Sequence, residues 1–173
     1  MLLDRVRDVR FRLGSVEATE VDDKLLELMV TSGGKLAPHL DMPLQSGANS
    51  VIRSMRRWHT REQYRARTLE IAARVGPLGL GADIISGFPG ETDADHRATV
   101  DLVSELPFTY LHVFPFSPRD GTPASGLSNP VPQRIAGERA RELRESGIAK
   151  GVAYRAKRVG CSARVVLEGE GRV

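Results

Sequence analysis

The sequence is poor in cysteine, since Cys161 is the one cysteine among 173 residues. A single thiol cannot build a disulfide framework, and it cannot supply a metal site that needs several thiolates. We therefore expect no cysteine-ligated metal within these residues. We interpret Cys161 as a small packed side chain.

Long apolar runs are also missing. No segment approaches the ~18 apolar residues that a membrane-spanning helix needs, and MLLDRVRDVRF at the start has no apolar region of the signal-peptide type. We therefore expect a cytoplasmic protein without a membrane partner. The hydrophobic content of 40% and the charged content of 27% are those of a globular chain, with one domain or one domain and a short appendage.

The sequence lacks the usual motifs of nucleotide-binding and hydrolytic sites. Neither a Walker A motif nor GxGxxG is present, which disfavours a simple phosphate-binding loop. No Ser-His-acid arrangement is legible. The four histidines, His39, His59, His96 and His112, are scattered, so we interpret each as structural. No catalytic residue is assigned from the sequence.

The net charge of +3 is small but unevenly spread. Residues 134–173 contain ten Lys and Arg against five Glu, whereas residues 1–133 contain 15 basic and 17 acidic side chains. A basic C-terminal segment favours a polyanionic partner such as RNA. A solvated helix face that happens to be rich in arginine explains the pattern equally well.

What the sequence does contain is a regular alternation of strand and helix patterns. Apolar or alternating runs predict strands over residues 9–15, 36–42, 79–88 and 109–116. Helical spacing predicts helices over residues 21–30, 48–57, 61–75, 92–106 and about 131–158. Thr60 is expected to cap the third, and the fourth is expected to open at Thr92 or Asp93. Such alternation indicates an α/β fold with a parallel sheet, either TIM-like or doubly wound.

Polar and glycine-rich residues follow each of the four predicted strands. They occupy residues 14–17, 43–47, 86–91 and 115–123. Because the carboxyl ends of parallel strands open on one face, we expect these segments to meet in one mouth, where such folds bind ligands. Each segment alone also fits an ordinary tight turn. Four in succession favour a ligand site.

The side chains in this mouth combine cations, carboxylates, an amide and a hydroxyl. Arginine forks bind carboxylates, carboxylates accept hydrogen bonds from hydroxyl and ammonium groups, and glycines allow a ligand to approach the backbone. A ligand that carries ribose, amine and carboxylate groups would use all of these. The residues are Glu17, Gln45, Ser46, Gly47, Arg57, Asp83, Gly87, Gly90, Arg119 and Asp120.

Four segments, in this order, resemble the motifs of the radical S-adenosylmethionine methylthiotransferases that modify tRNA. They are HLDMPLQSG (39–47), SMRRWHT (54–60), DIISGFPGET (83–92) and HVFPFSPRDGTPA (112–124). The upstream RLGSVEATEV most resembles the branch that acts on threonylcarbamoyladenosine next to the anticodon.

The resemblance implies the C-terminal half of a partial (βα)6 TIM-like barrel. S-adenosylmethionine and a [4Fe–4S] cluster would lie at its carboxyl-end mouth, and the reaction would add a methylthio group to C2 of an adenosine in tRNA. The cofactor-binding residues that the resemblance carries over are Glu17, Gln45, Ser46, Gly47, Arg57, Asp83, Gly87, Ser117 and Arg119.

The chain departs from the family pattern in its cysteines. Members hold the cluster with Cys-x3-Cys-x2-Cys and a second cluster in an N-terminal domain, and this sequence contains neither. We therefore expect a fragment, with residues 1–158 as later barrel units and residues 159–173 as the start of an RNA-binding β-barrel. Its missing partner is the N-terminal half of the same protein. Alone, it should be inactive and bind S-adenosylmethionine weakly or not at all.

Two single positions also depart from the family pattern. Asp41 stands where the family often has His, and His96 stands where it usually has Phe. His96 falls on the apolar face of its predicted helix, so we expect it to pack.

Two other functions remain open from the sequence. The same motifs serve relatives that thiomethylate isopentenyl-adenosine in tRNA or an aspartate of a ribosomal protein. From a different class, the chain could be a cluster-free module that binds RNA or a small ligand.

Overall fold

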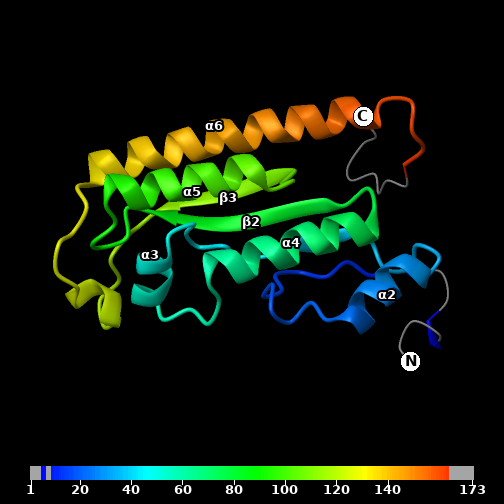
Figure 1. Cartoon of the computed structure of the whole chain (residues 1–173), viewed down its shortest axis with the longest axis horizontal. Helices are drawn as coiled ribbons and strands as arrows, with labels where there is room; N and C mark the ends of the chain where they lie inside the picture. Colours follow the sequence, from blue (N-terminus) through cyan, green and yellow to red (C-terminus); the bar gives the residue numbers. More distant parts are fainter. Residues whose placement is uncertain (1–4, 7–8, 164–173) are drawn as a thin grey trace.

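The computed structural model describes residues 5–6 and 9–163 (Figure 1). Three parallel strands form one sheet in the order β1-β2-β3. The strands are β1 (His39–Asp41), β2 (Gly79–Ser86) and β3 (Tyr110–Pro115). The helices are α2 (Asp23–Thr31), α3 (Asn49–Ser54), α4 (Arg61–Val75), α5 (Asp93–Glu105) and α6 (Gln133–Arg158), with a 3-10 turn η1 (Pro123–Gly126).

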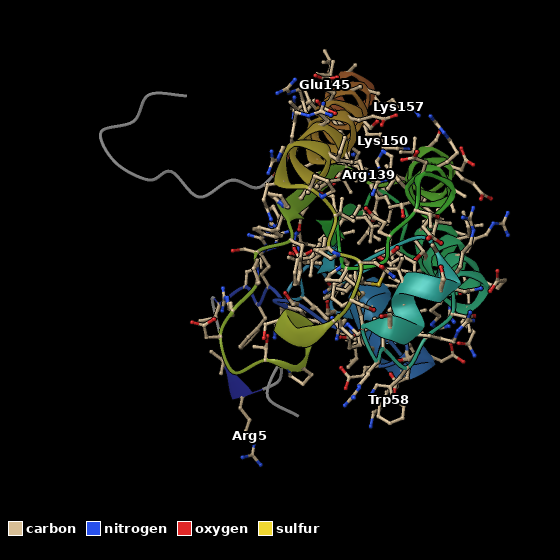
Figure 2. The ribbon with its side chains drawn as sticks, turned by 90° about the vertical axis from the view of Figure 1, so that its left-hand side faces the viewer. Arg5, Trp58, Arg139, Glu145, Lys150 and Lys157 are labelled. Carbon is tan, nitrogen blue, oxygen red and sulfur yellow. The ribbon has the colours of Figure 1, made fainter. Side chains whose placement is uncertain are left out.

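The strands follow one another in space as they do in sequence, each joined to the next through helices. A doubly wound sheet reverses its strand order at a switch point, and the sheet formed by the described residues has no reversal. Figure 2 views the end at which β2 stops and shows α4, α5 and α6 following one another around one side of the sheet. Of the two folds that the sequence left open, this arrangement matches the TIM-like one rather than the doubly wound one.

The segment before β1 departs from the prediction of a strand over residues 9–15. It runs parallel to β1 but forms only two isolated bridges, Phe11 to Leu36 and Ser15 to Asp41. The two bridges differ in register by one residue, so an extra residue on the β1 side interrupts the ladder between them. The predicted strand over residues 36–42 is shortened to three residues for the same reason.

The hydrophobic core lies between the sheet and the helices. Alternate residues of β2, Leu80, Ala82 and Ile84, are almost completely buried. They belong to one buried cluster with Ile71 of α4 and Leu102 of α5. The residues between them in β2 face the other side of the sheet, because side chains alternate along a strand.

Two helices begin at capping threonines, of which Thr60 was predicted as a cap and Thr92 as one of two possible helix starts. Thr60 caps α4 and Thr92 caps α5, and each cap is completed by the side chain three residues later, Gln63 or Asp95. Such capping boxes satisfy backbone amides that have no partner within the helix. The caps fix the N-terminal ends of α4 and α5, which lie nearest the carboxyl ends of the strands.

Predictions for single residues divide in outcome. His96 is buried as expected, and its Nε2 lies 2.7 Å from Glu142 Oε2 of α6. The prediction that Cys161 is packed was wrong, because the thiol is exposed. α6 ends at Arg158 and Gly160 turns the chain at φ +81°, so Cys161 follows the last helical contact.

The predicted start of a β-barrel over residues 159–173 lies outside the described residues beyond position 163, and the division at residue 158 stays a prediction. Among the helices that are described, none is long and apolar enough to cross a membrane.

Candidate functional site

The carboxyl ends of the strands surround a cavity of about 540 Å³. Three segments that are distant in sequence line it. Its lining residues are Gln45, Ser54, Met55, Arg56, Arg57, Ile85, Phe88, Phe116, Ser117, Arg119, Thr122, Pro123, Ala124 and Leu127. Four residues that the sequence nominated for cofactor binding, Gln45, Arg57, Ser117 and Arg119, are among them.

Gln45 extends the sheet beyond β1 at the cavity. Its amide donates to Asp83 O at 2.8 Å, and its carbonyl accepts from Ile85 N at 2.9 Å. The backbone of Gln45 adopts φ +63°, a left-handed conformation that is uncommon for residues other than glycine. Strained backbone of this kind gathers at ligand sites, where the surrounding structure holds it. The two hydrogen bonds to β2 hold Gln45 at the cavity wall.

The next two residues of the motif, Ser46 and Gly47, lie behind the wall. Ser46 is fully buried, and its Oγ lies 3.3 Å from Thr99 Oγ1 of α5. Gly47 N donates to the same hydroxyl at 2.9 Å, and a Cβ at this position would lie 2.6 Å from Thr99 Cα. These contacts pack the turn against α5. Cofactor binding by Ser46 and Gly47 stays a prediction.

Glu17 and Arg57 form an ion pair of 3.0 Å at the edge of the cavity. Both side chains are about one-third exposed, at 34% and 31%. Glu17 therefore neutralises Arg57 in part. No ion pair is recorded within the described part of the chain for the side chains of Arg56 and Arg119, which also line the cavity, so two cations are left to attract an anionic ligand.

Aromatic and apolar side chains complete the lining, and sequence reasoning did not assign them. Phe88 and Phe116 meet edge to face with ring centroids 5.2 Å apart. Both lie inside the motifs quoted above, GFPGET and FPFSPRDGTPA. Their position directly after strands was the signal that could have nominated them, because the first residues after a strand turn toward the mouth.

Gly87, another predicted site residue, lies against α6 rather than in the cavity lining. It adopts φ +74°, and a Cβ there would lie 2.3 Å from the Cβ of Ala136. Its amide donates to Glu91 Oε2 at 2.7 Å. Glycine is required here for the left-handed turn and for the close approach of α6. A contact between Gly87 and a cofactor stays a prediction.

Glu91 joins the GFPGET turn to α6 through a buried ion pair. Glu91 Oε2 lies 2.7 Å from Arg139 Nη1, and the two side chains are 2% and 9% exposed. Arg139 Nη2 also reaches Asp93 Oδ1 at 2.6 Å. One glutamate therefore holds both the turn after β2 and the last helix.

Asp83 lies with Asp41 and His112 on the face of the sheet that is turned away from the helices, here called the inner face. His112 Nδ1 lies 3.2 Å from Asp83 Oδ1 and 3.7 Å from Asp41 Oδ2. Burial raises the pKa of Asp41, and the nearby charge of Asp83 raises it further. Two carboxylates and an imidazole are ligand types that divalent cations accept, and one ligand atom from each lies within 4.8 Å of the others.

The same inner face carries a second polar group. Arg12 Nη2 lies 2.7 Å from His39 Nε2, which lies 2.8 Å from the hydroxyl of Tyr110. The rings of His39 and Tyr110 stack with an interplanar angle of 9°. Polar residues at every second position of HLD and YLHVF signalled this face in the sequence. Sequence reasoning interpreted His39 and His112 only as structural histidines and noted Asp41 only as a departure from the family pattern.

Comparison with known proteins relates the sequence to tRNA-modifying enzymes. No family model matches. The threonylcarbamoyladenosine tRNA methylthiotransferase MtaB of Aquifex aeolicus is 37% identical over 94% of this chain and 39% of its own length. MtaB of Bacillus subtilis is 37% identical over 78% of the chain and 30% of its own length. The tRNA-2-methylthio-N(6)-dimethylallyladenosine synthase of Desulfitobacterium hafniense is 32% identical over 92% of the chain and 36% of its own length. The chain thus spans less than two-fifths of these relatives.

Solved structures with the same arrangement show the fold. Coproporphyrinogen III oxidase of Escherichia coli, described as a radical SAM enzyme, matches with a TM-score of 0.53 at 20% identity, over 87% of this chain and 32% of that one. Elp3 of Methanocaldococcus infernus matches with a TM-score of 0.52 at 15% identity, over 84% and 32%. At these identities the likeness concerns the fold alone, an α/β arrangement with a parallel sheet.

Proposed function

We propose that this chain, which belongs by sequence to the radical S-adenosylmethionine tRNA methylthiotransferase family, forms the cofactor-binding mouth of an enzyme. That enzyme adds a methylthio group to C2 of threonylcarbamoyladenosine in tRNA. The observation that carries the proposal is the convergence of Gln45, Arg57, Ser117 and Arg119 on one cavity. These residues come from three motifs that are separated in sequence, and the cavity lies where parallel α/β folds bind ligands.

The lining of the cavity fits S-adenosylmethionine. Phe88 and Phe116 offer aromatic surface for an adenine ring. Arg119 offers a guanidinium for the carboxylate of the cofactor, and Gln45 offers an amide that both donates and accepts. When bound, S-adenosylmethionine supplies the radical and the methyl group. The residues of the chain bind it, orient it and exclude water from it.

The [4Fe–4S] cluster does not fit the residues of this chain. Clusters of this type are held by several cysteine thiolates, and the sequence contains only Cys161. Cys161 follows α6, whose last turn lies at the opposite end of the sheet from α3 and η1 (Figure 1). These residues therefore supply no ligands for the cluster that generates the radical. Their contribution is to bind and orient the cofactor.

The charge of the mouth favours threonylcarbamoyladenosine over isopentenyl-adenosine as the substrate. The threonylcarbamoyl group ends in a carboxylate, whereas the isopentenyl group is uncharged. Arg56 and Arg119 both line the cavity without an ion pair among the described residues. Their guanidinium groups give the mouth a positive charge that favours a substrate with a carboxylate.

A segment exchange tests this function directly. The matched segment of the Aquifex aeolicus relative is replaced by this chain, the purified hybrid is reconstituted with iron and sulfide, and methylthio-adenosine in tRNA is measured by mass spectrometry. We expect product on tRNA that carries threonylcarbamoyladenosine, and a loss of at least tenfold for Arg119→Ala, since one charge-assisted contact contributes ~1.5–3 kcal/mol.

Arg97→Ala is the matched control, because Arg97 is exposed on the outer helix α5 and should leave activity unchanged. A folded hybrid that binds its clusters but makes no product would contradict the proposal. Product only on isopentenyl-adenosine would reassign the substrate.

A further inference from the structure

Trp58 is the most exposed large apolar side chain in the part of the chain that the structure describes, at 96%. It is also the one tryptophan of the sequence. Figure 2 shows it projecting from the molecule at the end where the strands stop. A single exposed apolar residue is ordinary. A tryptophan that contributes nothing to the core, at the edge of a ligand cavity, needs another explanation.

The backbone around Trp58 is held firmly. Arg57 N donates to Ile52 O at 3.1 Å, and the Arg57 guanidinium pairs with Glu17. On the other side, His59 is buried, its Nε2 lies 3.3 Å from Leu44 O, and its ring lies 5.6 Å from that of Tyr64. Both neighbours of Trp58 are thus anchored to the body of the protein. The indole between them is presented to solvent on a rigid turn.

The surroundings of Trp58 are cationic rather than apolar. Arg53 and Arg56 are exposed, and neither side chain has a recorded partner within residues 5–6 and 9–163. Arg56 adopts φ +56° and also lines the cavity. Trp58 therefore follows two exposed arginines within five positions of the chain, and one of them lines the cavity. Ser54 and Thr60, which are also exposed, add polar surface.

We propose that Trp58 is a stacking platform for an unpaired RNA base, with Arg53 and Arg56 binding the adjoining phosphates. Single-stranded RNA is recognised by aromatic rings on which bases stack and by cations that follow the backbone. A protein partner would instead require apolar surface around the tryptophan. The inference rests on the proposed function, because a modified adenosine that enters the cavity leaves its neighbouring bases outside, at the rim.

Because Trp58 is the one tryptophan, its fluorescence reports stacking without any label. The complete chain is titrated at low salt with an unmodified stem-loop RNA that has the sequence of a tRNA anticodon arm, and binding is measured in parallel by filter retention. We expect binding that quenches Trp58 emission. A fully paired RNA duplex of equal length should be retained without quenching, since its bases are already stacked.

Variants separate the ring from the charges. Trp58→Ala should weaken stem-loop binding roughly five- to hundredfold, and Trp58→Phe should weaken it less. Neither should change the slope of affinity against salt. Arg53→Gln with Arg56→Gln should instead reduce that slope by about 1.4, at 0.7 for each phosphate contact on single strands. Unchanged circular dichroism of Trp58→Ala shows that the fold is intact, as expected for an exposed side chain.

The outcomes distinguish the inference from the function on which it rests. Stem-loop binding without quenching, or with equal affinity for Trp58→Ala, overturns the stacking role and leaves tRNA as the substrate. Absence of binding to either RNA overturns the stacking role and also counts against RNA recognition by this chain. A Trp58 shielded by protein contact would give the first of these results.

Discussion

At the scale of single residues, the inner face of the sheet is the least expected part of the molecule. Asp41 of β1 and Asp83 of β2 both lie close to His112 of β3, whose Nδ1 is 3.7 Å from Asp41 Oδ2 and 3.2 Å from Asp83 Oδ1. One oxygen of Asp41 is buried without a hydrogen-bond partner among the described residues. Two close carboxylates disfavour ionisation of each other, and burial does so as well. The raised pKa of Asp41 follows from both causes.

This raised pKa makes a prediction for Asp41→Asn. A carboxyl group whose pKa is raised by folding contributes stability below its unfolded pKa of about 3.8 and loses it as pH rises through the folded value. Asparagine has no charge to lose, so the free energy of unfolding of Asp41→Asn should exceed that of the wild type at pH 7. The gain should vanish near pH 3.5. Urea unfolding at both pH values measures it, and a pH-independent difference would contradict the argument.

At the scale of elements, the turn after β2 connects the sheet to its last helix. Glu91 accepts from Gly87 N and pairs with Arg139 of α6, and both charged side chains are almost completely buried. A buried charge that loses its partner is costly, since water does not replace the lost interaction. The GFPGET motif is thus structural at Glu91, whatever it contributes to ligand binding.

Arg139→Met should therefore destabilise the protein by about 3–5 kcal/mol. Arg134→Met is the matched control on the same helix, because Arg134 pairs with Glu138 at 2.6 Å while the two side chains are 75% and 49% exposed. An exposed pair of this kind contributes at most about 1 kcal/mol. Chemical unfolding followed by circular dichroism compares the two variants. Equal losses in the free energy of unfolding would show that the buried pair contributes no more stability than the exposed one.

At the scale of the whole molecule, two histidines that are half-buried or buried link stability to pH. Burial lowers the pKa of His39 and of His59. A lowered pKa means that the unfolded chain binds protons more readily, so the free energy of unfolding should fall as pH drops below about 6.5. Neutral solution is where both histidines are uncharged and the fold is favoured.

His59→Phe isolates one of these contributions. The variant keeps an aromatic ring beside Tyr64 but removes the titrating group, so its urea midpoint should fall less steeply than that of the wild type between pH 7.5 and pH 5.5. The other titrating groups are the same in both proteins and cancel in the comparison of slopes. Identical slopes would show that His59 does not titrate in this range.

Sequence reasoning was most successful for the elements and least successful for the direction of side chains. Thr60 was identified as a cap because a capping threonine acts within its own helix turn. Gln45, Arg57 and Arg119 were identified for the mouth because strand ends converge in a parallel sheet, whereas Ser117 was identified by the resemblance to a known family. Phe88 and Trp58 were missed, since an aromatic residue in a turn has no distinctive spacing.

The sequence by itself determined the order of the helices and of the three paired strands, and the motifs at the strand ends, because caps, periodicity and turn residues act over a few neighbouring positions. Only the tertiary structure decided which motif residues face the cavity. Ser46 and Gly47 are held behind the wall by Thr99, which lies more than fifty positions away on α5. Contacts between residues so distant in sequence depend on how the helices pack, and packing is a property of the whole chain.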